Sequence, residues 1–150
     1  MNIVIVGRPN VGKSSLFNRL LGRKRSLVLD TPGVTRDRIV EPATWWISAE
    51  EYHLNLIDTG GLGEGRFKEE IAYQVNTALQ EATIVLFVMD VRTGITHADE
   101  DVFNELRRSG LQENVPVIGV VNKVDHESFE DDLSEFYKFG LETLNANRLL

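Results

Sequence analysis

The chain has 150 residues, of which 42% are hydrophobic, and this length favours one domain with a sizeable core over two domains. The formal net charge of −7 excludes a surface that binds nucleic acid throughout, because such binding depends on Lys and Arg, so we expect any RNA contact to be local. The chain contains no Cys, which excludes disulfides and thiolate metal sites.

The first apolar run, residues 3–6, has no basic segment or cleavage site ahead of it. The longest apolar run, residues 82–89, is well short of the roughly 20 residues that span a bilayer. We therefore expect a cytoplasmic protein that has no membrane partner.

Three apolar runs rich in β-branched residues, at 3–6, 83–89 and 115–121, carry the predicted fold. Each run is followed by a turn and a helical pattern, which is typical of parallel strands buried on both faces of a sheet. After the first run, apolar residues at helical spacing predict a helix over residues 14–21 that Gly22 ends.

Two further strands are predicted over residues 43–48 and 52–57, joined by a polar turn at 49–51 as a β-hairpin. Helical patterns follow at residues 68–80 and 97–109.

The helix over 97–109 has clear end signals, because Thr96 and Asp99 form a plausible capping box and Gly110 ends the run. A last helix is predicted over residues 128–139 from the matching signals, which are Ser128, Asp131 and Gly140.

The predicted order is therefore strand, helix, two strands, helix, strand, helix, strand, helix. Right-handed crossovers turn this order into an α/β fold, a doubly wound and mostly parallel sheet with one antiparallel edge strand. Ligands of such sheets bind at the carboxyl ends of the strands.

A phosphate-binding loop is the strongest motif, because residues 7–14 fit G-x-x-x-x-G-K-[ST] between a predicted strand and a predicted helix. Backbone N–H groups of this loop wrap the phosphates, Lys13 reaches the β- and γ-phosphate oxygens, and Ser14 offers its hydroxyl to Mg²⁺. A chance glycine-rich turn would not be expected to fit all eight positions. The candidate nucleotide-binding residues of this segment are Gly7, Arg8, Pro9, Asn10, Val11, Gly12, Lys13, Ser14 and Ser15.

Two shorter motifs follow predicted strands. Asp58 opens a D-x-x-G motif and is expected to hold Mg²⁺ through a water molecule, while Gly61 offers a backbone N–H to the γ-phosphate. Asp125 of the second motif can accept hydrogen bonds from the guanine N1–H and 2-amino groups, which adenine does not present. Asn122 can brace the loop and the base edge, and Lys123 can lie along the ring. Polar turns of no function are the alternative for both motifs, but their order after a phosphate-binding loop argues against it.

The chain resembles the P-loop GTPases typified by Ras and, more closely, the first G domain of the EngA family, also called Der. The resemblance runs from about residue 2 to about residue 140. It rests on Arg-Pro-Asn at 8–10, on Asp-Thr-Pro-Gly-Val-Thr-Arg-Asp-Arg at 30–38, and on Asp-Thr-Gly-Gly-Leu at 58–62. Members of that family have two tandem G domains and a KH-like domain and act in assembly of the large ribosomal subunit.

The resemblance implies a P-loop NTPase fold and a GTPase that hydrolyses GTP to GDP and phosphate with Mg²⁺. Thr35 then meets Mg²⁺ and the γ-phosphate, with Thr31 as the weaker candidate, and the expected catalytic residues are Lys13, Thr35 and Gly61. It also implies a ribosome or large-subunit rRNA as partner, through regions outside this chain.

Two departures qualify the resemblance, the first from GTPases of the Ras type and the second from the family pattern. Leu62 stands where those GTPases place a Gln that orients the attacking water, so we expect slow intrinsic turnover. Asn10 offers a compensation, because related GTPases with Asn there coordinate K⁺; a plain turn residue is an equally weighted alternative.

The end of the chain is the second departure. The family pattern continues with a strand, a Ser-Ala motif that backs the guanine, and a helix, and residues 142–150 show no such motif. We therefore expect a single GTP-binding domain over residues 1–150 that lacks this terminal element. A nucleotide-gated binding switch with negligible hydrolysis is the alternative function.

Overall fold

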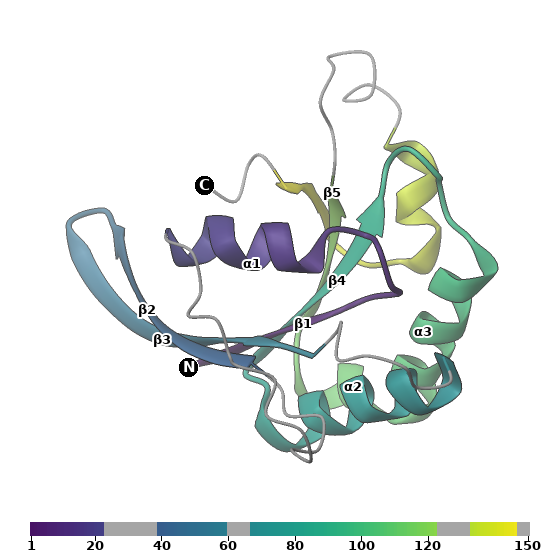
Figure 1. Cartoon of the computed structure of the whole chain (residues 1–150), viewed down its shortest axis with the longest axis horizontal. Coiled ribbons are helices and arrows are strands. Elements are labelled where there is room, and N and C mark those ends of the chain that lie inside the picture. The colour runs from purple at the N-terminus through teal and green to yellow at the C-terminus, as the bar shows by residue number, and fades with distance from the viewer. Residues whose placement is uncertain (23–38, 60–66, 123–132, 147–150) are drawn as a thin grey trace, which may run out of the picture.

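The computed structural model describes residues 1–22, 39–59, 67–122 and 133–146. The described residues form a six-stranded sheet in the order β2-β3-β1-β4-β5-β6 (Figure 1). All neighbouring strands are parallel except β2 and β3, so the predicted antiparallel edge strand is confirmed. The strands are β1 (Asn2–Val6), β2 (Ile39–Ile47), β3 (Glu50–Asp58), β4 (Ile84–Asp90), β5 (Val117–Asn122) and β6 (Thr143–Asn145).

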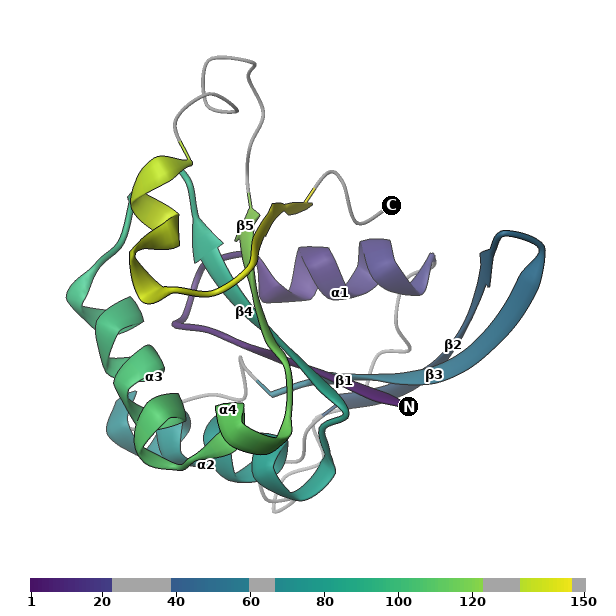
Figure 2. The ribbon, with the colours of Figure 1, turned by 180° about the vertical axis from the view of Figure 1, so that it is seen from behind.

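Helices cover both faces of the sheet, as Figure 2 shows from behind. One face packs against α1, and the other packs against α2, α3, α4 and the 3₁₀ helix η1. The bounds of these helices are α1 (Lys13–Leu21), α2 (Phe67–Glu81), α3 (His97–Arg108), α4 (Leu111–Asn114) and η1 (Ser134–Phe139). None of the described helices is long and apolar enough to cross a membrane.

Strand β1 shows why its sequence is continuously apolar. Val4 and Val6 belong to the core under α2 and α3, whereas Ile3 and Ile5 belong to the core under α1. Successive side chains of a strand point to opposite faces, so a strand covered on both sides needs apolar residues at every position. The doubly wound fold predicted from the apolar runs is confirmed.

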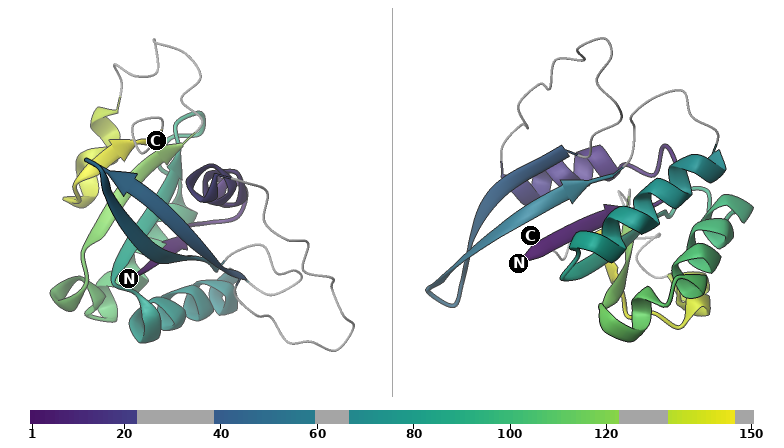
Figure 3. Two further views of the ribbon diagram at one scale, coloured as in Figure 1. Left: turned by 90° about the vertical axis from the view of Figure 1, so that its left-hand side faces the viewer. Right: turned by 90° about the horizontal axis from the view of Figure 1, so that it is seen from below.

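The β2–β3 hairpin extends beyond the body of the sheet (Figures 1 and 3). Its turn differs from the predicted turn at 49–51, because β2 pairs with β3 from Ile47 opposite Glu50. Only Ser48 and Ala49 lie between the strands, both with positive φ, at 52° and 67°. A two-residue turn of this kind follows the right-handed twist of the strands, and the pattern-based boundary missed it.

Two predictions for the last third of the chain are corrected. The described part of the helix predicted over 128–139 is a 3₁₀ helix, in which Phe136 donates to the carbonyl of Leu133 and Gly140 to that of Tyr137. Such i→i+3 bonding is typical of short pieces; residues 128–132 lie outside the described residues. No strand was predicted after residue 140, and the structure places β6 there, in parallel pairing with β5. Helix α4, a single turn, was not predicted either.

Candidate guanine-nucleotide site

The predicted phosphate-binding loop leaves the carboxyl end of β1 and enters α1, as the motif requires. The loop has no room for a side chain at Gly7, because a Cβ at this residue would lie 2.8 Å from the carbonyl oxygen of Val88 on β4. Asn10 and Gly12 take left-handed φ angles of 68° and 87°. The glycines thus allow the backbone to turn where a side chain would clash or be strained.

The N-terminus of α1 is open to an anion. Gly12 is its N-cap residue and provides no side-chain hydrogen bond, and the first turn carries no acidic residue. Helix α3 differs, because Thr96 and Asp99 cap it with the predicted capping box. The first N–H groups of a helix need partners and carry its positive dipole end, so an uncapped N-terminus after a glycine loop suits a phosphate.

Lys13 lies buried inside the loop. Its Nζ donates to the carbonyl oxygens of Gly7 at 2.7 Å and Arg8 at 2.9 Å. Burial lowers the pKa of the Lys13 ammonium, while the charges of Asp58 and Glu70 oppose that shift. The loop therefore encloses a cation that gains from an incoming anion.

Asp58 ends β3 and is buried beside the loop, since it pairs with Ile5 of β1 in the parallel register. Thr59, the next residue, is fixed by a 2.7 Å hydrogen bond from its hydroxyl to the carbonyl oxygen of Ile5. Ser14 is exposed in the first turn of α1. A carboxylate and a hydroxyl are hard oxygen donors, and Mg²⁺ is commonly held by one or two such protein ligands together with phosphates and water. The donor set fits Mg²⁺.

Asn122 is the last residue of β5 and connects the end of that strand to the phosphate loop. Its side-chain Nδ2 donates to the carbonyl oxygens of Val11 at 3.0 Å and Gly12 at 3.2 Å. The site residues at the ends of β1, β3 and β5 therefore gather on one edge of the sheet, where doubly wound folds bind their ligands. The other site residues predicted from sequence, Thr35, Gly61, Lys123 and Asp125, lie outside the described residues, as do Thr31 and Leu62.

Sequence reasoning missed two residues that hold the loop. Gln74 of α2 accepts a 3.0 Å hydrogen bond from the backbone N–H of Gly7. Asp99 of α3 lies 3.2 Å from the guanidinium of Arg8, whose Nη2 also donates to Thr93 at 2.6 Å. Gln74 left one signal in the sequence, a polar residue within the apolar stripe of its helix; Asp99 left none beyond its capping role.

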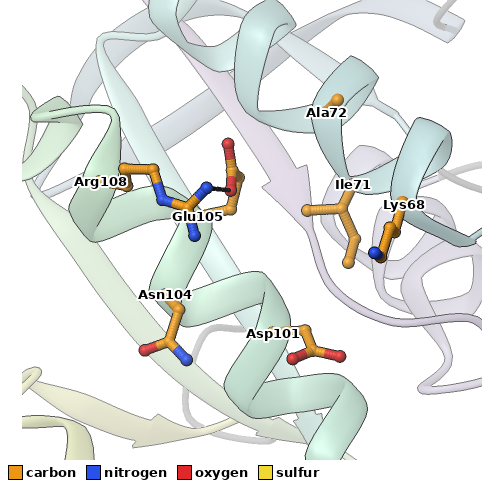
Figure 4. Close-up of a pocket in the computed structure, with 7 residues that line it drawn as sticks. All are labelled: Lys68, Ile71, Ala72, Asp101, Asn104, Glu105 and Arg108. Carbon is orange, nitrogen blue, oxygen red and sulfur yellow. Dashed lines mark ion pairs between the residues drawn. The ribbon is translucent and has the colours of Figure 1, made fainter.

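A separate groove of about 340 Å³ lies between α2 and α3 (Figure 4). Its lining mixes charges of both signs, with Lys68 on α2 and Asp101, Glu105 and Arg108 on α3. Arg108 and Glu105 pair across 3.6 Å within the same helix. None of the site residues predicted from sequence lines this groove, so it is distinct from the phosphate loop.

A family model described as 50S ribosome-binding GTPase matches residues 2–123. The chain belongs to this GTPase family. It is similar to GTPase Der of Enterococcus faecalis, with 50% identity over 141 residues, which are 93% of this chain and 30% of that protein. The chain thus spans about a third of the length of the curated relatives it matches. The EngA (Der) resemblance predicted from the motifs is confirmed.

Solved structures of GTPases have the same fold as this chain. The chain is similar to Aquifex aeolicus Era bound to GDP·AlF₄⁻, with a TM-score of 0.68 and 28% identity over 98% of this chain and 51% of the other. It is also similar to Era in complex with MgGDPNP and a segment of 16S ribosomal RNA, with a TM-score of 0.66 and 27% identity over the same shares. The predicted P-loop NTPase fold is confirmed.

Proposed function

We propose that this GTPase domain binds GTP and GDP with Mg²⁺ at the carboxyl edge of its sheet and hydrolyses GTP to GDP and phosphate. The observation that carries the proposal is the convergence of Lys13, Asp58 and Asn122 on one loop. The nucleotides in the two Era structures, GDP·AlF₄⁻ and MgGDPNP, support the same ligand class.

The proposed roles follow from the sequence motifs and, for the described residues, from their places around the loop. The N–H groups at the start of α1 bind phosphate oxygens, and Lys13 balances the charge of the β- and γ-phosphates. Ser14, Asp58 and Thr35 hold Mg²⁺, which neutralises charge on the phosphate oxygens when bound. Gly61 offers its N–H to the γ-phosphate. Because Leu62 cannot orient a water molecule, intrinsic turnover is slow.

The base is read by Asp125, with Lys123 along the ring and Asn122 bracing the loop. Strand β6 lies beside the end of β5, because Asn145 pairs with Val121, one residue before Asn122. Asn145 and the following Ala146 are both buried. We infer that this pair takes the place of the Ser-Ala motif that backs the guanine in the family.

Asn10 is proposed to hold K⁺ next to the phosphates. Its left-handed backbone places an exposed amide in the middle of the loop, and an amide oxygen is a neutral ligand suited to a large monovalent ion. An added positive charge there would offset the missing polar group at Leu62 in the transition state.

A role in ribosome assembly, with a ribosome or large-subunit rRNA as partner, is proposed from the family, from the name of the matching model and from the rRNA bound to Era. That role places the protein in the cytoplasm.

The function is tested by calorimetry with GDP and ADP, followed by GTP turnover in KCl and in NaCl at equal ionic strength. GDP should bind and ADP should not, and KCl should accelerate turnover in the parent but not in Asn10→Ala. Asp125→Asn should weaken the binding of GDP and allow xanthosine diphosphate to bind. Equal affinity for GDP and ADP would refute guanine selection, and binding of GTP without turnover would leave the binding switch as the function.

A further inference from the structure

Gln74 is a buried polar residue on the apolar stripe of α2. It is 1% exposed and lies between Ile71, Val75 and Ala78, which pack into the core. Gln is mostly an exposed residue, and burying its amide is unfavourable unless the amide is hydrogen bonded. The amide Oε1 accepts the N–H of Gly7 at 3.0 Å, so the carboxamide is kept in the core by a contact with the phosphate loop.

Gly7 depends on this contact. The residue is buried, and the space where its Cβ would stand is closed by the carbonyl of Val88 at 2.8 Å. Because Gly7 and this hydrogen bond are buried, water cannot easily replace Oε1, and without it the N–H would be left unsatisfied. The carbonyl of the same residue accepts from Lys13. Gly7 is thus held at its N–H by α2 and at its oxygen by Lys13.

We propose that Gln74 is a positioning residue for the phosphate-binding loop, acting through the N–H of Gly7. The inference rests on the proposed function, since it concerns binding of the nucleotide phosphates. Gln74 is buried and fixes the Val6–Gly7 peptide through the N–H of Gly7. The carbonyl that accepts from Lys13 belongs to the next peptide, so the contact restrains it through the Cα of Gly7. Loss of the contact lets that carbonyl rotate, which weakens phosphate binding while the contacts to the guanine and ribose are retained.

The test compares GDP with guanosine in the full chain, using displacement of a fluorescent GDP analogue. Gln74→Met keeps the length of the side chain and removes the acceptor, and Gln74→Asn keeps the amide and withdraws its oxygen. Each should lower GDP affinity about tenfold, which corresponds to about 1.4 kcal/mol, and change guanosine affinity less than about twofold. Thr77→Val is the matched control, because Thr77 is buried on the same helix about one turn further along.

The control should alter the melting temperature and leave the ratio of GDP to guanosine affinity unchanged. If both folded Gln74 variants keep the parental ratio, or if Thr77→Val shifts the ratio as strongly as they do, Gln74 is a structural residue only and the proposal fails. A parent chain that binds no guanine nucleotide would instead refute the proposed function, a result recognised before any variant is measured.

Discussion

Asn122 donates a 3.0 Å hydrogen bond to the carbonyl oxygen of Val11, which joins two residues 111 positions apart in the chain. The bond comes from the first residue of the predicted guanine-reading motif and ends in the phosphate-binding loop. A second bond from the same nitrogen reaches Gly12. The side chain of Asn122 therefore ties the end of β5 to the predicted phosphate-binding loop, and we expect a change at Asn122 to reach that loop.

Replacing Asn122 should weaken both the fold and nucleotide binding. Asn122→Ala removes the donor from one buried and one partly buried carbonyl group, at a cost of about 1–3 kcal/mol. Asn122→Asp has the same shape but turns an oxygen toward those carbonyls, so its free energy of unfolding should fall further. Urea unfolding of both variants measures the order of their stabilities, and GDP titration measures the accompanying loss of nucleotide affinity. An Asp variant as stable as the parent would show that the side-chain amide does not donate to the loop.

A second anchor of the loop is the ion pair of Arg8 with Asp99. The Nε and Oδ1 atoms lie 3.2 Å apart, without the alignment of a hydrogen bond, and both are buried. Removing one charge leaves the other buried and unpaired, so Asp99→Ala should lower stability by about 3–5 kcal/mol. Asp99→Asn keeps an oxygen that accepts from the N–H and the hydroxyl of Thr96. This variant therefore separates the role of Asp99 in capping α3 from the role of its charge beside Arg8.

A double-mutant cycle with Arg8→Met isolates this ion pair. Arg8→Met combined with Asp99→Asn should be more stable than the sum of the two single losses predicts, by about 0.5–3 kcal/mol. Additive losses in urea unfolding would mean that the two charges do not interact.

The sequence predicted those parts of the molecule whose signals are local. The apolar runs, the glycines of the loop and the capping box each specify structure within a few residues. The short elements α4 and β6 were missed, and η1 was predicted as an α-helix. A single turn or three strand residues are stabilised by tertiary packing, such as the burial of Phe136 and Leu111 in the core.

The residues of the site also divide into those with a local sequence signal and those without one. Lys13 and Asp58 were predicted because their motifs are contiguous. The contacts of Gln74 with Gly7 and of Asp99 with Arg8 join separate segments of the chain. No spacing rule relates such residues, since the fold alone brings them together.

The hairpin turn offers a stabilising change far from the site. Ser48 and Ala49 both have left-handed φ angles, which disfavour residues with a Cβ and suit Asn-Gly. Ser48→Asn with Ala49→Gly should stabilise the chain by about 1 kcal/mol and raise the melting temperature by roughly 2–4 °C. Ala49→Val should lower it, because a β-branched residue is strained there. A double variant that melts below the parent would contradict this account of the turn.

An exposed ion pair joins η1 to α3, and it predicts a dependence of stability on pH. Lys138 Nζ lies 2.8 Å from Oε1 of Glu100, and His97 lies 3.6 Å from the other carboxylate oxygen. The hydrogen bond from Lys138, followed by its charge, lowers the pKa of Glu100. A carboxyl group whose pKa is lower in the folded chain contributes stability above its unfolded pKa and loses that contribution as the pH falls through the folded value.

Lys138→Met removes the charge and keeps the stem, so it should be less stable than the parent above the ordinary Glu pKa of about 4.3. The two melting curves should converge as the pH falls below that value, because protonated Glu100 no longer distinguishes Lys from Met. The side chains of Lys138 and Glu100 are 52% and 38% exposed, so about 1 M NaCl should shrink the difference at neutral pH. Glu100→Gln is the control, since it should match Lys138→Met near neutral pH and lose its own pH dependence. A difference between parent and Lys138→Met that persists unchanged at low pH would assign the effect to packing of the Lys138 stem near the Phe139 ring, over which its Nζ lies 5.7 Å from the centroid.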